Sequence, residues 1–239
     1  MRKYLIFFMV FCSFTATLMA NTFSEYTSKL INIDGEYASI EDSDAIFVGS
    51  SGVVIHSFDA STSSIIARVD VVEKKGGLAK LRFDVYTGSA QSAFPIPGVV
   101  PQIGDTVKLN YLYSRALIVA PTQSIYKEIT EHFDDIQWIH PDIMATYLAR
   151  KFKPNPDRED FQATCKDNAA ALIFFALESH GYFVDCNNFK IIKSYKGSSW
   201  QNVQVPFYSR VSDIESSWLR WGSTQINDYH THYNALIQR

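Results

Sequence analysis

Residues 106–133 read TVKLNYLYSRALIVAPTQSIYKEITEHF, and the spacing of the apolar residues changes within this stretch. Before Pro121 the apolar runs are short and rich in β-branched residues, which is typical of strands. Beyond it Ile125, Ile129 and Phe133 recur every four residues, as on one face of a helix. The fold class predicted from this change is α+β, with an all-β half followed by a helix-rich α+β half.

The N-terminal half, residues 21–120, is predicted to be a small β-rich barrel or sandwich of seven or eight short strands. Turn residues bound the apolar runs throughout this half, and Asp34-Gly35 favours a tight hairpin turn. The prolines of segment 94–98 lack amide donors and so exclude a central strand there. The predicted strand pairs are 29–33 with 36–40, 47–48 with 53–56, 65–72 with 78–86, and 106–113 with 116–119.

The C-terminal half, residues 121–239, is predicted to be an α+β domain packed tightly on the first. After the helix at Ile125, a second helix is expected to begin at Pro141, and a third to run from Asn155-Pro156-Asp157 through Leu172 and Phe175 to Gly181. A hairpin of 182–185 with 189–194 is expected to turn at Asn187-Asn188. The last two expected elements are a helix that follows the capping box 212–215 and a helix over 228–237.

The first twenty residues have the pattern of a signal peptide. Arg2 and Lys3 are followed by an almost uncharged apolar run, and Ala20 is a small residue at a plausible cleavage point. An uncleaved membrane anchor is the alternative. We expect an exported protein with no transmembrane segment in the mature chain.

The composition excludes several classes of protein. The 239 residues are 46% hydrophobic and 20% charged, which is ordinary for a globular chain and argues against intrinsic disorder. Lys and Arg total 22 against 25 Asp and Glu, giving a net charge of −3. Because no basic excess is present, a nucleic-acid partner is not expected.

The mature chain would hold two cysteines, Cys165 and Cys186, since Cys12 would leave with the signal peptide. An oxidising compartment beyond the inner membrane allows these two thiols to pair in a single disulfide. Two separately buried thiols are the alternative. Their spacing matches neither a CxxC redox motif nor a zinc site.

No catalytic motif emerges from the sequence. Gly49-Ser50-Ser51-Gly52 lacks the glycines two positions either side of one serine that a hydrolase elbow needs, so a turn is favoured. Cys165 and His180 would lie about 22 Å apart on one helical run, too far for a nucleophile and its base. Neither nucleotide-binding glycine motif is present. We therefore expect no enzymatic activity and no cofactor.

The histidines and aromatic residues are predicted to have structural roles. A metal could be imagined at His132, Asp134, Asp135 and His140, or at His230 and His232, but neither set has a recognised ligand spacing, and helix-end or surface roles are favoured. His140-Pro141-Asp142 matches the tripeptide of J-domain cochaperones, but the two long helices that flank it there are not predicted here. Lys74 and Lys75 are expected to be solvated turn charges. Six aromatic residues could line a binding groove, but we expect them in the core or in the seam between the domains: Tyr111, Tyr113, Trp200, Tyr208, Trp218 and Trp221.

Motifs along almost the whole mature chain resemble the N-terminal domain of bacterial plasminogen-binding surface proteins. The matching stretches are IDGEYA at 33–38, VGSSGVV at 48–54, HSF at 56–58, SIIAR at 64–68, GGLAK at 76–80, LNYLY at 109–113, IVAP at 118–121, WIHPD at 138–142 and PFYSR at 206–210.

This resemblance implies a non-catalytic bacterial protein in the periplasm or on the outer surface of a Gram-negative cell. Its partner would be another protein, and host plasminogen is one candidate. Members of the family are thought to present C-terminal lysines to plasminogen kringles, which recognise an ammonium together with a nearby carboxylate. The present sequence stops at Arg239 without a lysine-rich tail, so Arg239 is the one residue expected to contact a kringle, and weakly, since Arg and Lys are not interchangeable. The alternative function is a periplasmic structural subunit of an envelope assembly such as the flagellar motor.

Overall fold

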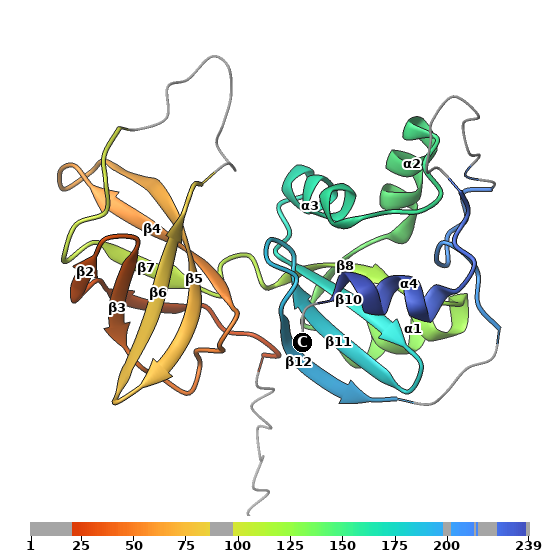
Figure 1. Cartoon of the computed structure of the whole chain (residues 1–239), viewed down its shortest axis with the longest axis horizontal. Coiled ribbons are helices and arrows are strands. Elements are labelled where there is room, and N and C mark those ends of the chain that lie inside the picture. Colours follow the sequence, from red (N-terminus) through yellow and green to blue (C-terminus); the bar gives the residue numbers. More distant parts are fainter. Residues whose placement is uncertain (1–20, 87–97, 198–201, 213, 215–223, 238–239) are drawn as a thin grey trace, which may run out of the picture.

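The computed structural model describes residues 21–86, 98–197, 202–212, 214 and 224–237, which form two lobes side by side (Figure 1). The first lobe is built on a seven-stranded antiparallel sheet, and the second on a five-stranded mixed sheet with helices. The protein is therefore α+β with a large share of strand. The predicted signal peptide, residues 1–20, lies outside the described residues, as does Arg239.

The sheet of the first lobe is strongly curled. Its strand order is β1-β7-β4-β5-β6-β3-β2, so its two outer strands are neighbours along the chain. The chain bends between them at Leu30, whose amide donates to Asp105 O, and Ile31, whose amide donates to Ser39 O. The strands are β1 (Tyr26–Lys29), β2 (Asn32–Asp34), β3 (Tyr37–Glu41), β4 (Ser51–Ser57), β5 (Ser63–Lys75), β6 (Leu78–Asp84) and β7 (Thr106–Leu109).

Two of the predicted hairpins are confirmed. β2 pairs with β3 across a turn at Gly35, and β5 pairs with β6 across Gly76 and Gly77. Gly35 has φ +59°, a backbone conformation that glycine adopts without steric cost. Alternate residues of these strands point inward and form a core of leucine, isoleucine, valine and alanine, with no aromatic ring among its fully buried members.

The second lobe has the strand order β12-β11-β10-β8-β9. β8 runs parallel to both β9 and β10, whereas β11 is antiparallel to its two neighbours, β10 and β12. Its elements are β8 (Arg115–Val119), α1 (Gln123–His132), β9 (Gln137–Ile139), α2 (Pro141–Lys151), α3 (Arg158–Asp167), β10 (Leu172–Leu177), β11 (His180–Asp185), β12 (Ile191–Lys196) and α4 (Tyr229–Leu236). The predicted helices at Ile125, at Pro141 and before Ile237 are confirmed, as is the hairpin turning at Asn187-Asn188.

The predicted hairpin of 106–113 with 116–119 is wrong, because β7 and β8 belong to different sheets. Between them Asn110 and Leu112 take positive φ angles of 56° and 63°, which turn the chain from one lobe to the other. Strand β8 is buried along four of its five residues, as suits a central strand with parallel neighbours. The change of sheet therefore precedes the domain join expected at Ala120-Pro121.

The predicted helix from Asn155 to Gly181 is too long. Asp157, not Asn155, caps α3 in a capping box with Asp160, and the helix ends at Asp167. The next apolar run is β10, all of whose six residues are buried. A short continuous apolar run carries no periodicity that separates a buried strand from a buried helix, which explains the error.

Helices cover both faces of the second sheet. One face packs against α2, α3 and α4 through Leu148, Phe161 and Tyr233. The other packs against Ile125 and Ile129 of α1 and against Phe23 from the start of the described chain. Among the described residues, no helix is both long enough and apolar enough to cross a membrane.

Candidate functional site

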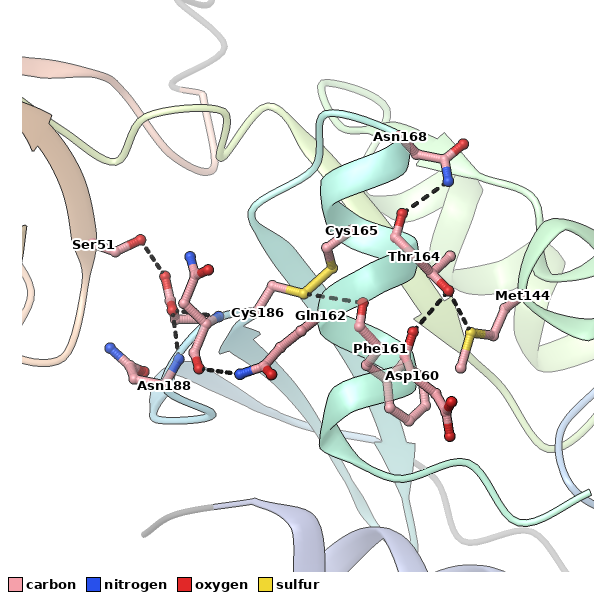
Figure 2. Close-up of a disulfide and its surroundings, with 12 residues drawn as sticks. Ser51, Met144, Asp160, Phe161, Gln162, Thr164, Cys165, Asn168, Cys186 and Asn188 are labelled. Atoms are coloured by element: carbon pink, nitrogen blue, oxygen red, sulfur yellow. Dashed lines mark hydrogen bonds between the residues drawn. A yellow bond between two sulfur atoms is a disulfide. The ribbon is translucent and has the colours of Figure 1, made fainter. Parts of the chain in front are cut away.

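The turn between β11 and β12 contacts the first lobe through Asn188. A disulfide joins Cys186 in this turn to Cys165 near the end of α3, with an S–S distance of 1.97 Å and Cα atoms 6.6 Å apart (Figure 2). Gln162, one helical turn before Cys165, also donates its amide Nε2 to Asn187 O at 2.6 Å. The predicted disulfide is therefore present, and it holds the turn against the helix.

Next to the disulfide, Asp185 is the centre of a buried polar network. Its Oδ2 accepts hydrogen bonds from Ser51 Oγ at 2.5 Å and from the Tyr113 hydroxyl at 2.8 Å. That hydroxyl in turn accepts from the Ser51 amide at 2.9 Å. Burial raises the pKa of Asp185, because the charged carboxylate loses its hydration. Burial also raises the pKa of Tyr113 well above its ordinary value. The network joins β4 of the first lobe to β11 of the second.

A second polar contact crosses the seam at Asn188. Its Nδ2 donates to Gly49 O at 2.9 Å and to Asp70 Oδ1 at 3.3 Å. A Cβ on Gly49 would lie 3.0 Å from Lys190 Cβ, and the φ of this glycine is +93°. Glycine at this position thus allows the two backbones to approach.

Aromatic rings complete the seam beside the polar network. Phe23 makes edge-on contacts with Phe47 at 6.1 Å, Tyr113 at 5.4 Å and Phe183 at 5.1 Å between ring centroids. The Lys193 ammonium lies 4.6 Å from the centre of the Phe23 ring, and burial lowers the pKa of this lysine. The lobes are therefore held together by rings as well as by hydrogen bonds.

A cleft of about 250 Å³ with both polar and apolar lining residues opens between the lobes beside the disulfide. We call it the interlobe cleft. Its described lining residues are Ser51, Gly52, Val53, Arg68, Tyr86, Tyr111, Leu112, Gln162, Cys165, Lys166, Ala169, Ala170, Ala171 and Asn187.

A smaller and more apolar groove of about 200 Å³ lies between α1 and strands β10 to β12. Ile125 and Ile129 of α1 face Phe174 and Tyr195 across it. No residue of α1 is fully buried. Lys127 and Glu131 are both exposed on this helix. The surface of α1 therefore presents a cation and a carboxylate four residues apart.

The side chains considered for catalysis occupy structural positions. Cys165 is oxidised in the disulfide, and His180 lies in β11, so the thiol of Cys165 cannot serve as a nucleophile. Ser51 donates to Asp185, and no histidine takes part in that contact. Ser50 is buried in the turn before β4. Ser51 and Gly52 of the predicted turn belong to β4, which pairs with β5 and β7, so the predicted hairpin of 47–48 with 53–56 is wrong.

Three of the histidines, His140, His230 and His232, contact backbone atoms. His140 Nδ1 accepts from the Asp142 amide and caps α2. His230 Nδ1 accepts from the Glu178 amide at 3.0 Å, and His232 Nε2 lies 2.8 Å from Pro156 O. Within the part of the chain that the structure describes, no three metal-type ligands come together.

The aromatic and lysine predictions have mixed outcomes. Tyr113 and Tyr208 are buried as expected, whereas Tyr111 lines the interlobe cleft. The prediction for Lys74 is wrong: it pairs with Asp42 at 3.0 Å and donates to the carbonyls of Ser43 and Ile46. Trp200, Trp218 and Trp221 lie outside the described residues, as does most of the predicted capping box 212–215.

Sequence reasoning missed Asp185 and Arg68, which shape the seam and the cleft. A weak signal for Asp185 exists, because it directly precedes a cysteine and a turn and follows the apolar run Phe183-Val184. Arg68 and Asp70 alternate with apolar residues in β5 and so resemble an ordinary exposed face. Asp70 accepts a hydrogen bond from Asn188 of the second lobe, and Arg68 lines the cleft between the lobes, so neither environment is contained in the local pattern.

Comparison with known proteins gives one consistent result. The family model described as "Plasminogen-binding protein pgbA N-terminal" matches residues 25–237. The Plasminogen-binding protein PgbA of Helicobacter pylori strain J99 is 24% identical over 196 residues, which is 80% of this chain and 43% of the relative. The protein of the same name from strain 26695 is also 24% identical over 196 residues, covering 42% of its length. The chain thus spans less than half the length of these curated relatives.

Proposed function

This chain belongs to the plasminogen-binding protein pgbA N-terminal family, and from that premise we propose that it is an exported, non-catalytic protein that binds another protein, with plasminogen as the first candidate. The match over residues 25–237 carries this proposal, because it includes both lobes and their seam. The Cys165–Cys186 disulfide supports export, since structural disulfides persist in oxidising compartments outside the cytoplasm.

Plasminogen kringles recognise a cation together with a carboxylate, and α1 offers both on its exposed surface. Lys127 and Glu131 are separated by about 6 Å along the helix axis, since each residue rises about 1.5 Å. Both side chains are exposed, so binding them requires no rearrangement of the core. We therefore propose Lys127, with Glu131, as an internal kringle contact in addition to Arg239.

Capture of plasminogen by the immobilised protein tests this function. We expect capture that a soluble lysine analogue competes away, because the analogue occupies the same kringle site. Lys127→Ala and a variant lacking Arg239 should each lower this capture. Lys75→Ala, which removes an equally exposed lysine at the β5–β6 turn, is the matched control and should leave capture unchanged.

Capture that resists the lysine analogue would contradict recognition through kringles. A complete lack of capture would favour the alternative, a periplasmic structural subunit. The observation that supports this alternative is a group of exposed apolar side chains at the bend of the first lobe, where Ile31 is 45%, Phe58 48% and Ile103 66% exposed. External protease treatment of intact cells separates the two functions, because a periplasmic subunit should resist cleavage.

A further inference from the structure

The interlobe cleft is lined by two cations and by no carboxylate among the described residues. Arg68 comes from β5 of the first lobe, and Lys166 comes from the end of α3 in the second. The remaining polar lining is neutral: the hydroxyls of Ser51, Tyr86 and Tyr111 and the side-chain amides of Gln162 and Asn187. A cavity with this lining favours an anion.

Arg68 has hydrogen-bonding capacity that the protein leaves unused. Its Nη2 lies 3.1 Å from Asp84 Oδ2 and 3.4 Å from Asp70 Oδ1. Its Nη1 is buried and has no hydrogen-bond partner among the described residues. The side chain is only 14% exposed, so water compensates little of this loss. A buried guanidinium nitrogen without an acceptor is costly, and such a group in a native protein needs an explanation such as a missing ligand.

The tyrosines of the cleft can add donors to the same ligand. Burial raises the pKa of Tyr111, so its hydroxyl stays protonated at neutral pH and can donate a hydrogen bond. Val53, Leu112 and the run 169–171 supply apolar walls beside these donors. The volume of about 250 Å³ is below the range of about 300–1,000 Å³ that is usual for drug-sized ligands. The lining thus suits a small molecule with one anionic end and a short apolar body.

We propose that the interlobe cleft binds a small organic molecule through a carboxylate, which Arg68 and Lys166 hold from opposite lobes. Arginine is suited to this role because its planar guanidinium matches the geometry of a carboxylate. A ligand between two lobes bridges them, as is common for sites at domain interfaces. This site does not depend on plasminogen binding, because none of its lining residues belongs to α1.

Calorimetric titration of the purified protein with succinate and butyrate, with succinamide as the uncharged comparison, tests the site. We expect both carboxylates to bind and the amide to fail. Arg68→Gln should weaken binding by at least about tenfold, which corresponds to the loss of one hydrogen bond to a charged group. The matched control is Arg82→Gln, which removes another cation that contacts Asp70, at 3.3 Å, but does not line the cleft.

Lys166→Gln keeps the proposal falsifiable if Arg68→Gln does not fold, because Lys166 is exposed at the end of α3. It should weaken carboxylate binding several-fold. Equal binding by the wild type and Lys166→Gln would overturn the two-cation arrangement. The absence of carboxylate binding to the wild type would overturn the site, and binding of inorganic phosphate alone would overturn the assignment to a carboxylate.

Discussion

The two lobes build their cores from different side chains. The fully buried core of the first lobe consists of leucine, isoleucine, valine and alanine, most of them from its antiparallel strands. The second lobe relies on aromatic rings, and Phe183 alone contacts Phe23, Phe133, Trp138, Phe174 and Tyr195. The buried core of the first lobe is therefore aliphatic, whereas the second lobe is organised around aromatic rings that come from distant segments of the chain.

This difference extends to the way in which each sheet is connected. The hairpins of the first lobe join strands separated by short turns at Gly35 and Gly76-Gly77. The central parallel pair of the second lobe brings Leu117 opposite Ile173, with α1, α2 and α3 between them in the chain. Long-range pairs occur in the first lobe as well, where β1 pairs with β7 and β3 with β6, but all of these are antiparallel. The disulfide lies in the second lobe and joins α3 to the turn after β11.

The largest expected effect follows from Phe183→Ala. The side chain is fully buried, and its loss should lower the free energy of unfolding by about 3–5 kcal/mol. Since Phe183 contacts Phe23 across the seam, hydrogen exchange should increase in both lobes. Leu81→Ala, a fully buried change in the first lobe, should increase exchange mainly there. Chemical denaturation gives the free energy of unfolding of both variants, and hydrogen exchange shows which lobe is affected. The same pattern of increased exchange in both variants would contradict the difference between the two lobes.

A smaller effect is expected when the disulfide is removed. Cys165 and Cys186 are 21 residues apart, and a closed loop of that size stabilises the folded state by about 3 kcal/mol. The double variant Cys165→Ser with Cys186→Ser should therefore unfold at lower urea concentration, and the second lobe should lose its structure first. Reductant should destabilise the wild type to a similar extent and leave the double variant unchanged. A loss confined to the first lobe would refute this assignment.

The smallest effect concerns the pH dependence of stability through Asp185 in the seam. Burial raises its folded pKa above 3.8, so the folded state retains a proton that the unfolded state releases first. The contribution of Asp185 to the free energy of unfolding is thus greatest at low pH, and it falls as the pH rises through the pKa of Asp185 in the folded state.

Asp185→Asn removes this titration, so the stability of the wild type relative to the variant should decrease from about pH 4 upward and then become constant. Urea unfolding at a series of pH values measures the difference. The carboxyl groups with lowered pKa values, such as Asp142 and Asp228, act in the opposite direction but are common to both proteins and cancel. A difference that grows with pH in favour of the wild type would show that Asp185 is stabilised as an anion.

Local signals in the sequence were sufficient wherever a turn or a cap decides the structure. Asp34-Gly35 predicted its hairpin, and Pro141 predicted the start of α2. Asp228 predicted the start of α4, where its side chain accepts from the Thr231 amide. In each case the controlling interaction spans only a few residues, so the sequence pattern contains it.

Two of the errors arose at short apolar runs, β8 and β10. Strand β8 followed β7 closely enough to suggest a hairpin, and β10 followed α3 closely enough to suggest a longer helix. Neither short apolar run specifies its partner, because the free energy of each strand comes from neighbours far away in the chain. The interlobe cleft was missed for the same reason, since Arg68 and Lys166 are nearly one hundred residues apart.

By itself the sequence determined the α+β class, most turns and helix starts, the family resemblance and the two cysteines available for a disulfide. The tertiary structure alone decided the pairing of β8 with β10, the burial of Asp185 between Ser51 and Tyr113, and the meeting of two cations in one cleft. The physical reason is range: turns and caps are local hydrogen bonds, whereas desolvation and sheet pairing depend on which distant surfaces exclude water together.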